Sequence, residues 1–101
     1  MRETPIMRSD SSPRVTRHDD RGRYELDIDG EVVAFADFST GDELITIPYI
    51  ETAVEHRGKG YSVMLMDGVI DDLRSHGARV RATCPVARGH IAASATELLV
   101  R

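Results

Sequence analysis

Polar and apolar residues alternate along the first half of the chain, and a period of two predicts β-strands. The first clear strand covers about 24–28, where acidic residues separate the apolar ones. The Asp29-Gly30 pair that follows is favoured in two-residue hairpin turns. A nearly continuous apolar run predicts a second strand over about 31–38, covered on both faces, with a turn at 39–42.

Residues 44–54 are rich in β-branched side chains, which favour strands. Pro48 interrupts this run, and proline has no N–H to donate to a neighbouring strand. We therefore expect a bend or a break at Pro48, with one strand near 44–47 and another near 49–54.

The period changes after Gly60, where apolar residues recur at helical spacing and predict an amphipathic helix over 60–75. Gly77 is well placed to end this helix. A short alternating segment predicts another strand over 79–83, and residues 86–101 predict a short terminal helix. Together these elements predict an α/β (α+β) fold with a sheet of about five strands.

The N-terminal residues 1–14 are polar and contain two prolines, which predicts a disordered tail before a single domain over 15–101. A chain of 101 residues has room for one hydrophobic core. The net charge of -4, without any long basic run, argues against nucleic acid or an anionic membrane as the main partner. No apolar segment approaches the roughly 20 residues that cross a bilayer, and no signal peptide is evident, so we expect a cytoplasmic protein. The oligomeric state stays open.

A glycine-rich turn carries a predicted strand into the predicted helix. It contains two glycines, Gly58 and Gly60, and two cations, Arg57 and Lys59. Free N–H groups at a helix N-terminus, the helix dipole and the absence of a Cβ at glycine together suit an anion. The spacing matches neither the three-glycine dinucleotide fingerprint nor the nucleoside-triphosphate loop. The residues alone leave two interpretations open, a tight structural turn or a phosphate site.

The same turn resembles the acetyl-CoA pyrophosphate loop of the GNAT superfamily of N-acetyltransferases. Arg57 and Gly60 match its usual form, and Ser62 takes the place of its final small residue. The likeness extends over about 23–91 to the small single-domain proteins of this superfamily. The residues that carry it are Tyr24, Leu26, Asp29-Gly30, Val33-Ala34, Glu51-Thr52, Val54, Arg57-Gly58-Lys59-Gly60 and Cys84-Pro85.

The resemblance implies a GNAT-like mixed sheet in which two parallel strands, here 49–54 and 79–83, separate and admit the pantetheine arm of acetyl-CoA. It implies acetyl-CoA as the acyl donor, with its pyrophosphate on the loop amides of 58–62 and backbone groups near Ala53 and Val54 facing the pantetheine. The implied cofactor-binding residues are Ala53, Val54, Arg57, Gly58, Lys59, Gly60, Tyr61 and Ser62.

Two residues are candidates for the chemistry. Glu51 lies on the strand before the loop, where the superfamily often has a carboxylate that serves as base; the alternative is a solvated strand residue. Cys84, the single cysteine, excludes an intramolecular disulfide and agrees with a reducing compartment. We expect it beside the separated strands, as an acyl acceptor, as an acid for the leaving thiolate, or only as packing. Cys84 and His90 lack further ligands at suitable spacing, so no metal site is expected.

These implications favour an N-acetyltransferase that transfers an acetyl group from acetyl-CoA to an amine, which the sequence does not identify. The alternative is a non-catalytic module that binds or senses CoA or acyl-CoA, and a purely structural domain is a third possibility. The three differ in whether the ligand binds and whether an amine is acetylated.

Overall fold

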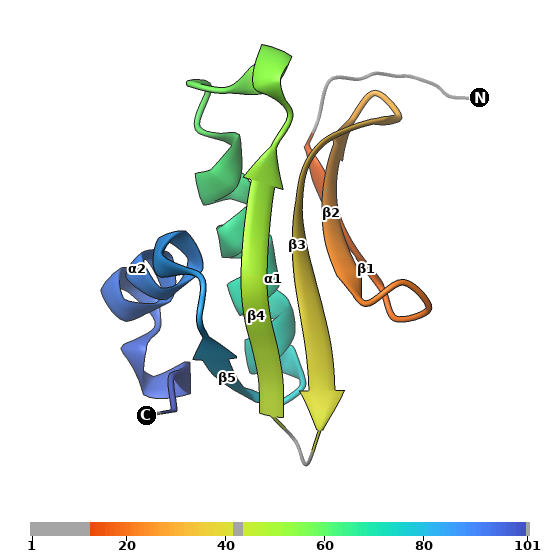
Figure 1. The fold of residues 1–101 in the computed structure, drawn as a ribbon. Coiled ribbons are helices and arrows are strands. Elements are labelled where there is room, and N and C mark those ends of the chain that lie inside the picture. The colour runs from red at the N-terminus through yellow and green to blue at the C-terminus, as the bar shows by residue number, and fades with distance from the viewer. Residues whose placement is uncertain (1–12, 42–43, 101) are drawn as a thin grey trace, which may run out of the picture.

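The computed structural model describes residues 13–41 and 44–100. Within them, strands form one sheet in the order β1-β2-β3-β4-β5, and two α-helices pack against it (Figure 1). The elements are β1 (Arg14–His18), β2 (Arg23–Ile28), β3 (Glu31–Gly41), β4 (Leu44–Thr52), the 3-10 helix η2 (Val54–His56), α1 (Tyr61–Ser75), β5 (Arg79–Ala82), α2 (Pro85–Ser94) and the 3-10 helix η3 (Thr96–Leu98). β1 to β4 pair antiparallel, and β5 pairs parallel with β4. This is the mixed α+β fold that the sequence predicts.

The strands of this sheet are not all the predicted ones. The sequence pattern gives β1 no strand of its own, because Val15 is its one large apolar residue, and it pairs with Leu26 of β2. β3 continues to Gly41, so the expected turn at 39–42 is wrong for its first three residues; Asp42 lies outside the described residues. Residues 1–12 of the predicted tail over 1–14 also lie outside them, whereas Pro13 is described and Arg14 already belongs to β1.

The C-terminal helix is shorter than predicted. α2 ends at Ser94, and the chain then turns through η3, where Leu98 is buried in the core. The N–H of Val100 donates to the carbonyl of Val80 (2.9 Å), so the last described residues run along β5. The predicted helix over 86–101 is therefore too long. Its final described residues lie along the outer edge of the sheet instead. Arg101 lies outside the described residues.

The irregularity predicted at Pro48 is a β-bulge, which bends the strand, and the predicted division into two strands is wrong. Asp37 pairs with Tyr49 and Ser39 pairs with Thr46, so β4 places one extra residue opposite Phe38. A bulge leaves a residue outside the regular ladder, and that is a position where proline's missing N–H does little harm. One continuous β4 therefore replaces the two predicted strands.

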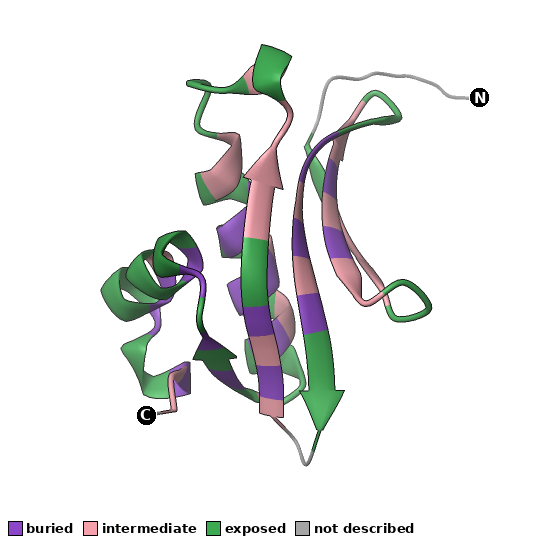
Figure 2. Ribbon diagram, in the orientation of Figure 1, coloured by how far each residue is buried: buried purple, intermediate pink, exposed green. Residues whose placement is uncertain are grey.

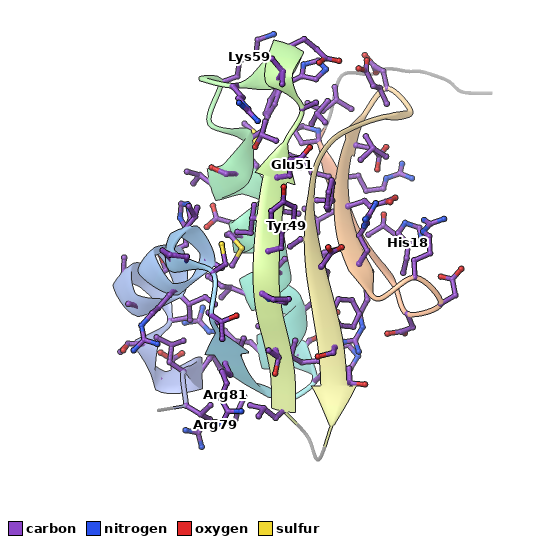
Figure 3. All side chains as sticks on the ribbon, in the orientation of Figure 1. His18, Tyr49, Glu51, Lys59, Arg79 and Arg81 are labelled. Carbon is purple, nitrogen blue, oxygen red and sulfur yellow. The ribbon has the colours of Figure 1, made fainter. Side chains whose placement is uncertain are left out.

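The bulge changes which side chains of β4 face the helices. Before it, Ile47 is completely buried in the core. Beyond it, Ile50 pairs with the buried Ala36 and so shares the helix-facing side. Tyr49 and Glu51 point to the opposite side, which no described helix covers and which we name the open face (Figure 3). Without the extra residue, Ile50 would lie on the open face, and Tyr49 and Glu51 would face the helices.

β5 accompanies β4 only as far as Ile47, which pairs with Ala82. The N–H groups of Thr83 and Cys84 both donate to the Ile47 carbonyl, at 3.1 and 3.3 Å, and the chain then turns into α2. The rest of β4 has no β5 partner, and we name this gap between the strands the notch. The prediction that 49–54 and 79–83 separate is thus only partly right: 48–52 of β4 lacks a β5 partner, but β5 itself pairs along its whole length with 44–47 and the strands separate after Ala82.

α1 covers the helix-facing side with one apolar stripe, as its spacing predicts. Its buried residues are Leu65, Met66, Val69, Ile70 and Leu73. Gly77 ends the helix in a left-handed conformation (φ 63°), with its N–H bonded to the Arg74 carbonyl and the Ala78 N–H bonded to that of Leu73. The Tyr24 hydroxyl donates to Asp72 (2.6 Å), which ties α1 to β2. None of the described helices has the length and apolarity needed to cross a bilayer.

Two glycines in helices give opposite predictions for replacement by alanine. A Cβ at Gly68 would lie 2.5 to 2.9 Å from three side-chain atoms of Val15 on β1, whereas a Cβ at Gly89 would meet nothing within 4 Å. Gly68→Ala should therefore lower the free energy of unfolding by about 1–3 kcal/mol, because α1 must move away from β1. Gly89→Ala should raise it by up to about 1 kcal/mol through helix propensity. Urea denaturation measures both, and an increase for Gly68→Ala would contradict this packing.

Candidate functional site

The glycine loop leads from η2 into α1 and leaves open space above its backbone. Gly58 and Gly60 have φ angles of 83° and 77°, a left-handed conformation that residues with a Cβ rarely adopt. A Cβ built on either glycine would meet no atom within 4 Å. Glycine is therefore favoured here by backbone conformation, and the space next to it is free for a ligand.

The N-terminus of α1 has the properties of an anion site. Gly60 is its N-cap residue and supplies no side-chain cap, so the first N–H groups of the helix have no partner within it. The helix dipole adds partial positive charge at the same point. Arg57 bonds through Nε to the Thr52 carbonyl (3.2 Å), and Lys59 lies exposed at the tip of the loop (Figure 3). These groups fit a pyrophosphate, which needs N–H donors and positive charge.

A cleft of about 340 Å³ lies between this loop, the end of β4 and the start of α2. Its lining includes five of the eight predicted cofactor-binding residues: Arg57, Gly58, Gly60, Tyr61 and Ser62. It also includes Ile50, Thr52, His56 and Val86, which the sequence analysis did not select. The alternation along β4 could have identified Ile50 and Thr52, but the approach of Val86 from α2 depends on the tertiary fold.

The other three predicted cofactor residues, Ala53, Val54 and Lys59, lie outside the lining of this cleft. The Ala53 N–H donates to the Val33 carbonyl (2.9 Å), and its side chain borders a depression on the open face. Val54 is 72% exposed, because β4 ends at Thr52 and η2 begins at Val54. The expected strand to residue 54 is thus too long.

His56 connects the glycine loop to the hairpin of β2 and β3. Its Nε2 lies 2.9 Å from an oxygen of Glu31, and its ring centroid lies 5.9 Å from that of Tyr61. Its Nδ1 is buried without a hydrogen-bond partner among the described residues. Glu55 brings a third potential ligand atom within 4.8 Å, but both carboxylates are exposed, which is common for acidic groups without a metal. The contact joins residues 25 positions apart, so no local signal predicts it.

Glu51 forms a pair with Tyr49 on the open face. The Tyr49 hydroxyl donates to the Glu51 carboxylate, and the Tyr49 ring packs 6.0 Å from that of Phe35. The hydrogen bond to Glu51 raises the pKa of the Tyr49 phenol above its usual value, so the phenol keeps its proton near neutral pH. Strand alternation places residues two apart on one face, and it could have predicted this pair.

Cys84 lies on the other side of the sheet from Glu51. It is the N-cap residue of α2, is 9% exposed and belongs to the hydrophobic core. Its N–H is bonded to the Ile47 carbonyl, at the base of the notch. The two predicted catalytic residues therefore border the notch from opposite faces, and no hydrogen bond joins them among the described residues.

Comparison with known proteins agrees with this arrangement. A family model described as GCN5-related N-acetyl-transferase matches residues 23–97. The chain belongs to the GCN5-related N-acetyltransferase family. This family generally uses acetyl-CoA as acyl donor. No curated protein sequence gives a significant match.

Solved structures share the fold of this N-acetyltransferase domain. A GCN5-like protein from Staphylococcus aureus, determined by NMR, has a TM-score of 0.64 and 16% identity over 86% of this chain and 87% of that chain. The ribosomal-protein-S18-alanine N-acetyltransferase from Escherichia coli has a TM-score of 0.58 and 20% identity over 72% of this chain and 50% of that chain. At these identities the likeness shows the fold alone, so the roles of individual residues must come from this structure.

The Tyr49 pair gives a prediction for the pH titration of this N-acetyltransferase. Because the Glu51 carboxylate stabilises the protonated phenol, Glu51→Gln should lower the pKa of Tyr49 towards the ordinary tyrosine value of about 10. Tyrosine ring NMR signals followed against pH measure the shift, with Tyr49→Phe identifying the signal. An unchanged Tyr49 titration in Glu51→Gln would show that the two side chains do not interact in solution.

Proposed function

We propose that this chain binds acetyl-CoA across the glycine loop and the notch and transfers the acetyl group to an amine on the open face. The observation that carries the proposal is the departure of β5 from β4 at Ile47, next to an uncapped, glycine-lined helix N-terminus. The loop suits the pyrophosphate of a CoA thioester, and the unpaired edge of β4 suits its extended pantetheine arm. Family membership supports the same donor.

The pantetheine arm lies along β4 beside Ile50 and Thr52 in this proposal. The Ala53 N–H is engaged with β3, and successive residues of a strand direct their N–H groups to alternate sides. The backbone of Ile50 therefore faces the notch and can pair with pantetheine amides. The Ile50 N–H also lies where it can polarise a thioester carbonyl, as an oxyanion donor does.

Glu51 serves as the base and Tyr49 as the acid. Glu51 takes a proton from the incoming ammonium group, and the neutral nitrogen attacks the thioester carbonyl carbon. The C–N bond forms and the C–S bond breaks, while the CoA sulfur takes the Tyr49 proton. The proton left on the nitrogen then returns to Tyr49. Cys84 lies buried on the helix side, and we assign it a packing role beside the notch.

Calorimetric titration with acetyl-CoA tests donor binding. Gly60→Asp places a side chain and a negative charge where the pyrophosphate should lie, so it should weaken binding at least about 100-fold. Gly77→Asp is a matched control, because Gly77 also has a positive φ and an open Cβ position but lies at the other end of α1. It should leave the affinity unchanged. Equal affinity of wild type and Gly60→Asp, or no binding to the folded wild type, would contradict the proposal.

Steady-state release of CoA with a panel of primary amines tests the chemistry. Glu51→Gln should lower kcat at least about 100-fold without changing acetyl-CoA affinity, because it removes the base and keeps the shape. Tyr49→Phe should lower kcat about tenfold or more, and Cys84→Ala should leave it within about threefold. Loss of turnover in Cys84→Ala, with Glu51→Gln fully active, would instead assign the chemistry to the thiol. Tight acetyl-CoA binding without acetylation of any amine would favour the non-catalytic module.

A further inference from the structure

A shallow depression of about 270 Å³ lies on the open face beside Glu51. β2, β3 and the end of β4 form it, and no described helix covers it (Figures 1 and 2). Its floor and walls include Arg23, Glu25, Val32, Phe35, Glu51 and Ala53. The depression and the donor cleft therefore lie on opposite faces of the same segment of β4, since Glu51 and Ala53 border one while Ile50 and Thr52 border the other.

The sheet register sets the order of groups in this depression. Glu25 pairs with Phe35, and Phe35 pairs with Glu51, so the three form one row across the open face. Adjacent strands lie about 4.8 Å apart, which places the backbones of Glu25 and Glu51 about 10 Å from each other. Phe35 is the middle residue of this row, and its ring contacts Arg23 and Tyr49. The row therefore offers an aromatic surface with a carboxylate at each end.

These carboxylates differ in whether the protein already neutralises them. Glu25 lies 3.1 Å from His18 and 3.3 Å from Arg21. Glu51 accepts a hydrogen bond from the neutral Tyr49, and no described cationic side chain forms an ion pair with it. Glu51 is thus the carboxylate of the row that is available to a cation from outside.

A cationic side chain of the protein itself already lies beside the Phe35 ring. Arg23 lies over Phe35, 3.9 Å from the ring centroid, and bonds to Asp37 (3.1 Å). The pairing of Arg23 with Asp37 keeps this guanidinium away from Glu51. Apart from Glu51 and the paired Arg23 and Glu25, the residues that line the depression are apolar, and they extend over β3 to Val32, which is 43% exposed.

We infer that the acceptor is a primary amine at the end of an unbranched aliphatic stem, either a free alkylamine or a lysine side chain. This inference rests on the proposed function. The ammonium group pairs with Glu51, and the stem lies against Val32, Phe35 and Ala53. A carboxamide on the carbon next to the nitrogen would instead place polar groups against Phe35 and Ala53, because Arg23 and Glu25, which also line the depression, already have partners; this placement is costly. α-Amino groups of peptides are therefore poor acceptors.

Acceptor kinetics with saturating acetyl-CoA test this directly. We expect kcat/KM for n-pentylamine and for Nα-acetyl-lysine methylamide to exceed that for alanine amide at least tenfold. The ratio between the first two compounds tells whether a free amine or a lysine side chain is the better source of this group. Equal or faster acetylation of alanine amide would overturn the inference.

Charge at Val32 provides a second test, because the residue is exposed and its replacement should not disturb the core. Val32→Lys and Val32→Glu both remove the apolar contact of Val32 with the stem and differ in the sign of the added charge. KM for n-pentylamine should therefore be several-fold higher in Val32→Lys than in Val32→Glu, with acetyl-CoA affinity unchanged. Ala93→Lys and Ala93→Glu, on the exposed side of α2, make the same changes of net charge far from the open face and should have no effect. Equal KM values for both Val32 variants would overturn the placement of the amine.

The failure of this inference and the failure of the proposed function give different results. Absence of acetyl-CoA binding by calorimetry contradicts the proposed function itself. Normal acetyl-CoA binding with preferred acetylation of alanine amide keeps the N-acetyltransferase assignment and overturns only the acceptor class.

Discussion

The Ile47 carbonyl is the last link between the two parallel strands, and the geometry of the site depends on it. Thr83 and Cys84 share this one acceptor, after which β5 gives way to α2 and β4 continues alone. The bulge at the next residue, Pro48, adds one position to β4. The two strands therefore separate at the same point in the fold at which the bulge changes the faces of the β4 side chains. The first creates the notch, and the second decides which side chains face each side of it.

This local geometry lets a short chain divide its proposed reaction between two faces. On the helix side, Gly58 and Gly60 expose backbone N–H groups and free space at the start of α1. On the open face, Glu51 and Tyr49 form a hydrogen-bonded pair a single residue away from the cleft lining. An acyl donor and an amine can thus approach one segment of β4 from opposite sides, and proximity supplies a large part of the catalysis. No helix among the described residues covers the open face, which leaves the acceptor side accessible to solvent.

Local patterns predict much of this structure, because several features depend on neighbouring residues alone. The helix over 60–75, its glycine stop and the anion-suited loop follow from spacing and from the backbone freedom of glycine. The bulge does not, because it depends on how β4 aligns with β3, where two residues of β4 lie opposite Phe38. The prediction of two separate strands around Pro48 is therefore wrong because the local sequence does not show how β4 aligns with β3. The same shift places Glu51 on the face opposite Cys84, so the two candidate catalytic residues lie on different sides of the sheet.

The central claim is that CoA lies along the glycine loop and the unpaired edge of β4. Titration of the ¹⁵N-labelled protein with CoA, followed by amide NMR, tests it most directly. The account predicts the largest shifts at Gly58, Gly60, Ser62 and Ile50, with little change along β1. Shifts concentrated instead around Gly77, at the opposite end of α1, would contradict it.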